Sequence, residues 1–227
     1  MNAQTVYSLA RAALEVVCAS QSYDVNTVIA HREVFRYDDA LYNLSELVNL
    51  AMDEMQKSKP TGNLYSAMKK LIKAATKNVN ANLHGAWIDA EGWMTVCDGH
   101  RFIRTKEHFD NLPMAKGVDS SVEIARSARR DSVNTLPLPS VGDLKIHIAN
   151  CKAENSKFPD YYYELADGYA VDAQYLLEML SAFPVTECKC GKRNAPYYFC
   201  TEENGEVVAE GVLLPARFKK KEETVNA

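Results

Sequence analysis

Residues 64–102, LYSAMKKLIKAATKNVNANLHGAWIDAEGWMTVCDGHRF, decide the fold because they change from a helical pattern to a strand pattern. In the first part of this stretch apolar residues recur at helical spacing: Leu64, Met68, Leu71, Ile72 and Ala75. The later part holds two apolar runs, residues 83–89 and 93–97, and the intervening Ala-Glu-Gly suits a hairpin turn. The stretch therefore predicts a helix over residues 63–77 and then a pair of antiparallel strands.

The same order of helix and strands recurs in the second half of the chain. Residues 172–183 carry apolar side chains at helical spacing, and Pro184 closes this predicted helix. Further strands are predicted over residues 144–148, 161–165, 185–190, 197–201 and 207–213. Units of this kind, laid side by side, predict an α+β domain with helices on one face of an antiparallel sheet.

The rest of the chain surrounds this domain. Helical spacing of apolar residues over residues 4–19 and 38–56 predicts an N-terminal helical extension. Residues 110–142 are rich in proline, glycine, serine and asparagine, and they predict a long loop or insertion inside the domain, with a short element over residues 122–128. The predicted organisation is a helical extension, an α+β domain and a flexible tail, at residues 1–60, 61–218 and 219–227.

The composition limits the classes of function. The chain has 227 residues and a formal net charge of −4, so contact with nucleic acid would have to come from a local basic surface. No apolar run is long enough to cross a bilayer, and the first residues lack the pattern of a signal peptide. We therefore expect a cytoplasmic protein without membrane contact, with its six cysteines reduced. No cofactor is expected.

Motifs in the predicted domain resemble one known family. Residues 64–75 and 84–89, followed by VCDGHRF at residues 96–102, resemble the start of the middle domain of the bacterial DNA polymerase III beta subunit, the DNA sliding clamp. In that family a helix leads to a hairpin that ends in Thr-Asp-Gly-His-Arg. Here Cys97 stands in place of the threonine, and Asp98 to Arg101 match.

Later stretches resemble the same family in chain order. Residues 143–148 and 169–180 are similar to a strand and a helix of the clamp's last domain. Residues 211–218, GVLLPARF, are similar to the clamp's C-terminal strand, which ends in Met-Pro-Met-Arg-Leu. The resemblance thus covers residues 61–218 discontinuously, and the helices before residue 57 have no counterpart in it.

The resemblance implies a DNA-clamp-like fold and a non-enzymatic function. A clamp of this family has three such domains in each chain, and two chains close a ring around DNA. This chain holds the equivalent of one domain, so a closed ring would need self-assembly into a homo-oligomer.

The lysines of the predicted helix over residues 63–77 are the candidate DNA contacts. In the family's fold, helices line the central hole and face the DNA backbone. The resemblance therefore implies weak contacts with the phosphates of double-stranded DNA, without sequence specificity, from Lys69, Lys70, Lys73 and Lys77. A solvated helix face, with lysines that keep the protein soluble, would show the same pattern.

The C-terminal strand is the candidate partner site. In clamps the corresponding strand, together with the arginine of the Asp-Gly-His-Arg motif, lines a pocket for short linear peptides of replication proteins. The resemblance therefore implies a peptide site formed by Arg101, Val212, Leu214, Pro215 and Arg217. The open alternative is that Val212 and Leu214 are inward-facing residues of an alternating strand.

Three other patterns can each be explained either by a function or by the structure alone. Asp98 and His100 could serve acid–base or metal chemistry, but a tight turn with glycine at a special backbone angle explains them better. Cys188 and Cys190 lack the usual spacing of zinc ligands and suit a core. The arginines in the predicted loop could contact phosphates or form a solvated basic loop: Arg126, Arg129 and Arg130.

The sequence therefore favours a non-enzymatic, clamp-like protein that binds DNA, docks replication proteins through its C-terminal strand, or does both. The first alternative is a protein-interaction module that keeps the fold without binding DNA. The second is a metal-dependent enzyme that acts on nucleic acid through Asp98 and His100.

Overall fold

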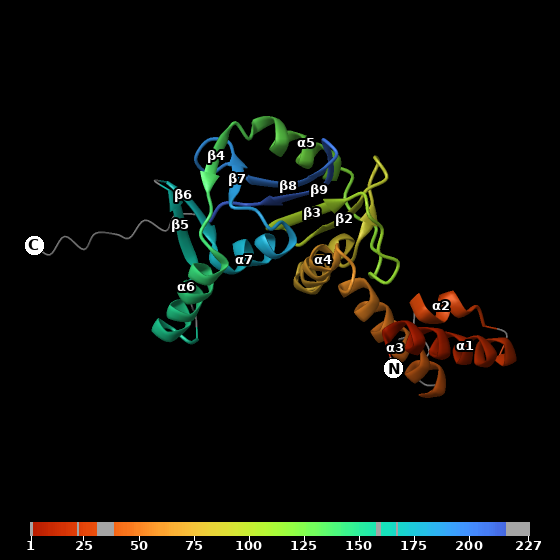
Figure 1. Ribbon diagram of the computed structural model, residues 1–227. Coiled ribbons are helices and arrows are strands. Elements are labelled where there is room, and N and C mark those ends of the chain that lie inside the picture. Colours follow the sequence, from red (N-terminus) through yellow and green to blue (C-terminus); the bar gives the residue numbers. More distant parts are fainter. Residues whose placement is uncertain (1, 22, 31–38, 158–159, 167, 217–227) are drawn as a thin grey trace, which may run out of the picture. The chain divides into compact units, whose positions relative to one another are not determined.

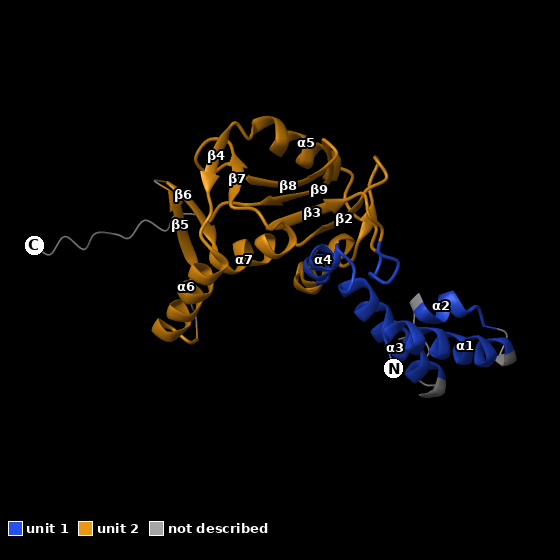
Figure 2. Ribbon diagram, in the orientation of Figure 1, with its two compact units in different colours: residues 1–69, 109–114 blue, residues 70–108, 115–227 orange. Residues whose placement is uncertain are grey.

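The computed structural model describes residues 2–21, 23–30, 39–157, 160–166 and 168–216 (Figure 1). The chain divides into two compact units, coloured separately in Figure 2. Unit 1 comprises residues 1–69 and 109–114, and unit 2 comprises residues 70–108 and 115–227. The helix α4 (Gly62–Ala75) begins in unit 1 and ends in unit 2.

Unit 1 is built mainly from three further helices. These are α1 (Ala3–Gln21), α2 (Val25–Ala30) and α3 (Asp39–Lys57). A shared core joins them, and its buried side chains are Ala10, Leu14, Cys18, Val28, Leu41 and Val48. The helices predicted over residues 4–19 and 38–56 are thus confirmed.

Unit 2 contains an antiparallel sheet of seven strands in the order β1-β2-β3-β9-β8-β7-β4. The strands are β1 (Trp87–Ile88), β2 (Met94–Cys97), β3 (Arg101–Thr105), β4 (Asn134–Pro137), β7 (Glu187–Cys190), β8 (Tyr197–Glu203) and β9 (Glu206–Leu213). A separate antiparallel pair is formed by β5 (Tyr162–Ala166) and β6 (Tyr169–Asp172). Together with the helices, this architecture confirms the predicted α+β class.

Helices cover both faces of the large sheet. Figure 1 shows α5 (Ser121–Asp131) on one face and α7 (Ala173–Ala182) on the other. The side chains of Phe102, Tyr198 and Val212 pack against α5. The alternate residues point the opposite way, because successive side chains of a strand face opposite sides. Phe199 accordingly stacks on Phe183, which directly follows α7.

The predicted strand over residues 144–148 is wrong. These residues belong to helix α6 (Val141–Glu154), in which Leu144, Ile148 and Cys151 are buried on one side. The side chain of Ser140 accepts a hydrogen bond from the backbone N–H of Asp143 and caps the helix start. The alternation of Leu144 and Ile148 with polar residues fits a strand, but their spacing of four also fits a helix.

The predicted long loop over residues 110–142 is also wrong for much of its length, because this stretch includes α5 and β4. The buried residues of α5 are small: Ser121, Ala125 and Ala128. Small residues give a weak apolar pattern, which explains why the sequence did not predict this helix in full. The predicted strand over residues 83–89 is shorter than expected, since a 3-10 turn occupies Ala81–Leu83 and only Trp87–Ile88 pairs as β1.

Candidate functional site

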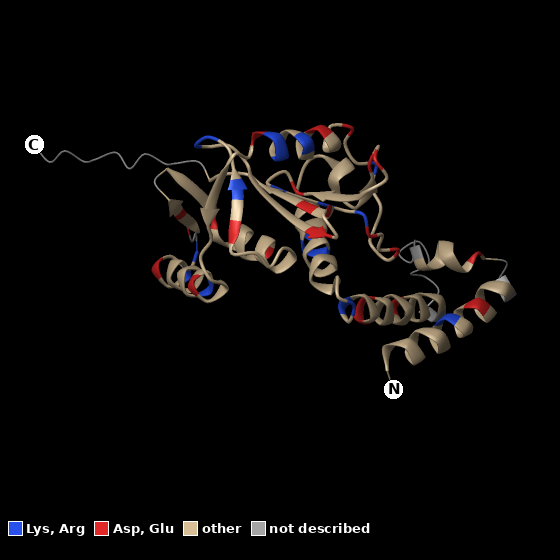
Figure 3. Cartoon of the chain, turned by 45° about the horizontal axis from the view of Figure 1, so that its top comes forward, with Lys and Arg blue, Asp and Glu red and all other residues tan. Residues whose placement is uncertain are grey.

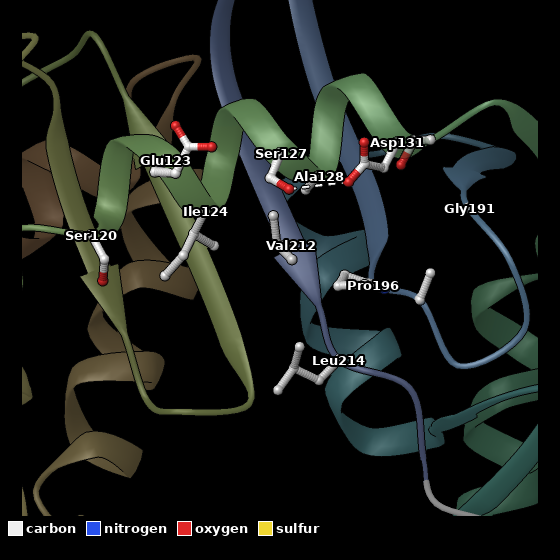
Figure 4. Close-up of a pocket in the computed structure, with 12 residues that line it drawn as sticks. Ser120, Glu123, Ile124, Ser127, Ala128, Asp131, Gly191, Pro196, Val212 and Leu214 are labelled. Carbon is white, nitrogen blue, oxygen red and sulfur yellow. Dashed lines mark hydrogen bonds between the residues drawn. The ribbon is translucent and has the colours of Figure 1, made fainter.

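A groove of about 490 Å³ opens in unit 2 beside helix α5. Its walls come from α5, from the turn between β7 and β8, and from the end of β9 (Figure 4). The apolar residues that line it are Ile124, Ala128, Ala195, Pro196, Val212 and Leu214. The groove is therefore assembled from three segments that lie far apart in the sequence.

The depth of the groove follows from the small residues of α5. Ala125 and Ala128 let this helix approach the sheet over Phe102 and Val212, and Val212 is buried beneath it. At the open side the side chain of Leu214 is 43% exposed and that of Ile124 is 41% exposed. The site thus combines a buried apolar base with exposed apolar edges, which is an arrangement typical of a binding surface.

A buried carboxylate anchors α5 to the sheet. Glu210 of β9 is fully buried and accepts a hydrogen bond of 2.6 Å from Arg104 of β3. The Tyr198 hydroxyl donates to the same carboxylate at 2.8 Å, and Arg129 of α5 forms a salt bridge with it. Burial, with the Glu210 carboxylate nearby, raises the pKa of Tyr198, so this tyrosine remains protonated. Arg129 thereby fixes one end of the groove wall.

A second set of charges supports the other part of α5. Arg104 forms salt bridges with Asp89 and Glu91, and Glu91 also pairs with Arg126 of α5. Burial alone would raise the pKa of Asp89. The hydrogen bonds from Arg104 and from the backbone N–H groups of Glu91 and Trp93, together with the charge of Arg104, outweigh burial and lower this pKa. The hydrogen bond from Arg104 likewise lowers the pKa of Glu91. The arginines of this helix therefore serve largely in ion pairs with the protein itself.

Figure 3 shows the resulting charge pattern on α5, with basic residues along the helix and acidic residues toward its ends. Arg126 and Arg129 contact carboxylates of the sheet region, and Arg130 pairs with Asp131 at 2.9 Å. The prediction that these arginines lie in a loop is wrong, because they lie on a helix; the side chains of Arg126 and Arg130 are nevertheless more than half exposed.

Some of the predicted partner residues line the groove and others do not. Val212 and Leu214 both line the groove. Pro215 is half-buried and lies directly after Leu214. Arg217 lies outside the described residues. The strand residues predicted from the motif are thus brought together with a helix that the sequence motif did not include.

Arg101 does not present its guanidinium to a ligand. Its side chain is 3% exposed and forms salt bridges with Asp98 and with Glu178 of α7. Its guanidinium also lies over the ring of Tyr175, 4.2 Å from the ring centre. These contacts tie β3 to α7, and this geometry does not support the predicted contribution of Arg101 to a peptide site.

The Asp-Gly-His-Arg motif forms a turn that positions the end of β9. The Asp98 carboxylate accepts backbone hydrogen bonds from His100 at 2.9 Å and from Arg101 at 2.7 Å. Gly99 has a φ of +91°, in the region that favours glycine. The carbonyl of His100 accepts the N–H of Leu214 at 2.9 Å, so the turn orients a groove residue. Asp98 is thus occupied by structural contacts.

The candidate DNA-binding lysines lie along α4 and just after it. Lys70, Lys73 and Lys77 are exposed, and within the described part of the chain we find no carboxylate in salt-bridge distance of any of them. Lys69 belongs to unit 1, where it pairs with Asp53 while half of its side chain stays exposed. Lys70, Lys73 and Lys77 are therefore exposed lysines of unit 2 that lie on α4 or just after it.

Helix α7 adds no positive charge to this set, since its sequence contains no lysine or arginine. Its carboxylates are engaged by the protein. Glu178 pairs with Arg101, and Asp172 caps the helix by accepting backbone hydrogen bonds from Gln174 at 2.8 Å and Tyr175 at 3.1 Å. Both carboxylates are thus held in contacts within unit 2.

Cys188 and Cys190 face inward from β7 and are buried. Burial raises the pKa of Cys188 to about 12, so its thiol is protonated at neutral pH. Among the described residues we find no group of three or more His, Cys, Asp and Glu side chains placed to hold a metal ion. The two cysteines therefore act as small core residues, in agreement with the structural interpretation of their spacing.

Comparisons with known proteins give structural likeness only. No family model matches the sequence, and a search of curated proteins gave no match. Similar solved structures include the Helicobacter pylori beta clamp in complex with diflunisal, at 13% identity and a TM-score of 0.39, with 68% of this chain and 64% of that chain covered.

Two further solved structures are similar to this chain. One is the DNA polymerase III subunit beta of Borrelia burgdorferi in complex with a natural product, at 14% identity and a TM-score of 0.40, with 69% of this chain and 62% of that chain covered. The other is a putative DNA polymerase III beta subunit of Eubacterium rectale, at 10% identity and a TM-score of 0.40, with 68% and 64% covered. This is the family that the sequence motifs resemble, and this chain spans less than two thirds of the length of each of these structures.

Among the helices of the described residues, none is both long enough and apolar enough to cross a bilayer.

Proposed function

We propose that this chain is a non-enzymatic, clamp-like scaffold that binds a short extended segment of a partner protein in the groove between α5 and the end of β9. The observation that supports this proposal is that Val212 and Leu214, chosen from the sequence as partner residues, line an open apolar groove. The partners implied by the sequence resemblance are replication proteins that carry short peptide motifs.

The shape and chemistry of the groove suit an extended peptide. Alternate side chains of an extended segment point the same way, so apolar residues spaced by two could contact Ile124, Val212 and Leu214 together. Full burial of one leucine-sized side chain contributes about 1.5–3 kcal/mol. Because association has its own entropic cost, a few such contacts give weak binding, on the order of micromolar.

Binding of a defined probe tests the groove. The probe is a fluorescein-labelled heptapeptide, Ser-Leu-Ser-Leu-Ser-Leu-Ser, measured by fluorescence anisotropy. We expect the double variant Ile124→Ser and Leu214→Ser to weaken binding at least tenfold, since it removes both exposed apolar edges. Ile146→Ser, which changes an exposed isoleucine of α6 outside the groove, serves as the control and should leave affinity unchanged. Equal affinity of the groove variant and the wild type would refute the proposed site.

We further propose that the exposed lysines of unit 2, Lys70, Lys73 and Lys77, contact the phosphate backbone of double-stranded DNA. Their exposure and the absence of salt bridges to the described residues support this second activity. Three lysine–phosphate contacts predict a slope of about −2.7 for the logarithm of the binding constant against the logarithm of salt concentration. Such binding is weak and independent of sequence.

DNA binding can be separated from the peptide groove by charge reversal. A triple variant with glutamate at positions 70, 73 and 77 should lose binding to a labelled 20-base-pair duplex at about 50 mM salt. A control with Lys116, Lys145 and Lys152 changed to glutamate carries the same charge change at other exposed positions. Loss of binding in both variants would show a bulk charge effect and contradict the proposed contacts. If the wild type binds the peptide but not DNA, the chain acts as an interaction module alone.

Encirclement of DNA also requires self-association. The solution mass at micromolar concentration distinguishes a ring-forming assembly from a monomer, which would bind DNA only at one face. A homo-oligomer is the expected result if this chain encloses DNA as the resembled family does.

A further inference from the structure

The groove has an acidic border. Besides its apolar residues it is lined by Glu123 and Asp131, and these are the only charged residues among the described residues that line it. Hydroxyl groups of Ser120, Ser127 and Ser132 complete its polar edge. All five polar residues come from α5 or its ends, so the α5 wall carries the polar groups of the groove beside Ile124 and Ala128, and the facing wall is apolar.

Of the three arginines of α5, Arg130 is the one that pairs with a carboxylate of the groove, and it also donates a hydrogen bond to Ser127 at 3.3 Å. Arg126 pairs with Glu91, and Arg129 is held by the buried carboxylate of Glu210. Arg130 pairs with Asp131, but both side chains are more than half exposed, at 69% and 59%. Exposed pairs of this kind are weak and easily exchanged. A cation of a ligand could therefore replace Arg130 beside Asp131.

Glu123 is the more available of the two carboxylates. It lies in the first turn of α5, and in the described part of the chain it forms no salt bridge. One helical turn separates it from Ser127, whose hydroxyl donates to Asp131 at 3.1 Å. The carboxylates thus stand near opposite ends of the groove wall, with the apolar base of Ala128 and Val212 between them.

We infer that the groove selects a partner segment that is basic as well as apolar. Its apolar side chains would lie on Ile124, Val212 and Leu214, and flanking lysines or arginines would approach Glu123 and Asp131. This inference rests on the proposed function and specifies its ligand. A site that included Arg101 and Arg217 would instead have favoured an acidic segment. Arg101 is buried in its own ion pairs and so is not available for that role.

Three probes that share one apolar pattern test the inference. Each carries Leu-Ser-Leu-Ser-Leu, flanked on both sides by two lysines, two serines or two glutamates, and each is fluorescein-labelled. At about 50 mM salt we expect the lysine-flanked peptide to bind most tightly, the serine-flanked peptide less tightly and the glutamate-flanked peptide least tightly. The lysine and glutamate peptides should differ roughly tenfold, since each exposed pair changes affinity by up to about fivefold. The difference should shrink at high salt, because exposed charges are screened.

Variants of the two carboxylates give the decisive comparison. Glu123→Gln with Asp131→Asn should bring the three affinities together, and Glu123→Lys with Asp131→Lys should reverse their order. The matched control is Glu202→Lys with Glu203→Lys, which makes the same charge change at exposed positions of β8 outside the groove. The control should keep the wild-type order. Circular dichroism of each variant checks that the overall helix content is retained.

The outcomes separate the inference from the proposed function. If all three peptides bind equally and the Ile124 and Leu214 variant abolishes binding, the groove is real and its charge selectivity is refuted. If that variant binds like the wild type, the proposed function itself fails. If the control variant reverses the order as well, the preference arises from the overall charge and the inference is overturned.

Discussion

The two faces of the large sheet in unit 2 are covered in different ways. On the α7 face, large apolar side chains interlock: Phe199 stacks on Phe183, with ring centres 6.1 Å apart, and Gly211 leaves room for Met179 and Phe183. On the α5 face, the helix contributes alanines to the contact and is held by arginine–carboxylate pairs. The first face is closed, and the second leaves a groove.

This difference shows how one sheet can serve stability and binding at once. Close packing of large side chains on the α7 face leaves little space for a ligand. Helix α5 instead reaches the sheet through Ala125 and Ala128, and its position depends on charges around Glu210. We therefore expect substitutions on the α7 face to change stability, and those on the α5 face to change binding as well.

The largest effect is expected on the α7 face. Phe183→Ala removes a fully buried ring and should lower the free energy of unfolding by about 3–5 kcal/mol, as measured by urea denaturation. Phe183→Leu keeps much of the volume and should lose far less. A loss below about 1 kcal/mol for the alanine variant would show that this face is not closely packed.

The next effect concerns the anchor of α5. Glu210→Gln removes the buried charge between Arg104 and Arg129 and should destabilise the protein by about 3 kcal/mol. It should also weaken peptide binding, because the groove wall loses its anchor. Glu203→Gln, at the exposed end of β8, is the control and should change neither property. If the Glu210→Gln protein is folded and its peptide affinity is unchanged, the ion pairs around Glu210 are not needed for binding in the groove.

Acid should act on the α5 face through Asp89 and Glu91. The pKa of each carboxyl group is lower in the folded protein than its ordinary value. Each group therefore stabilises the fold fully at a pH above its ordinary pKa. This contribution is lost as pH falls through the lowered pKa, so the free energy of unfolding should fall below about pH 4. Glu91→Gln should show a shallower loss over that range. An identical pH profile in this variant would contradict the assignment.

The smallest effect is a difference in thiol reactivity between the faces. Cys190 lies opposite Tyr197 in the sheet register, so Cys188 and Cys190 share the α7 face with Phe199. Cys200 is half-buried at the α5 cluster. At pH 8 a disulfide reagent should label Cys200 well before Cys188, whose pKa is about 12. Cys200→Ser should remove part of the early labelling, and rapid labelling of Cys188 would show that its face is open.

The sequence predicted the elements with strong periodicity. The helices corresponding to α4 and α7 and the strands corresponding to β2 and β9 follow from regular apolar spacing. Helix α5 was predicted only as a short element within a loop, because its inward residues are small. A charged residue in the middle of the apolar strand β9, Glu210, is the signal that could have indicated a buried partner such as Arg129.

The candidate site was predicted in part. Val212 and Leu214 were chosen from the C-terminal motif, and they line the groove. The role of Arg101 could not be predicted from the motif, since its partner Glu178 lies 77 residues away in the chain. The acidic residues of α5 could not be predicted as part of the site either, because no pattern in the sequence places residues 123–131 beside the end of β9.

Cross-linking of the peptide probe tests the groove most directly. A lysine-flanked leucine peptide with a photoreactive leucine can be irradiated in complex with the protein and the linked residues identified by mass spectrometry. We predict cross-links within residues 120–132, 191–196 and 212–214. Unit 1 offers a competing apolar surface, since Leu9, Val16 and Leu50 are exposed. Cross-links confined to α1 and α3 would contradict binding in the groove.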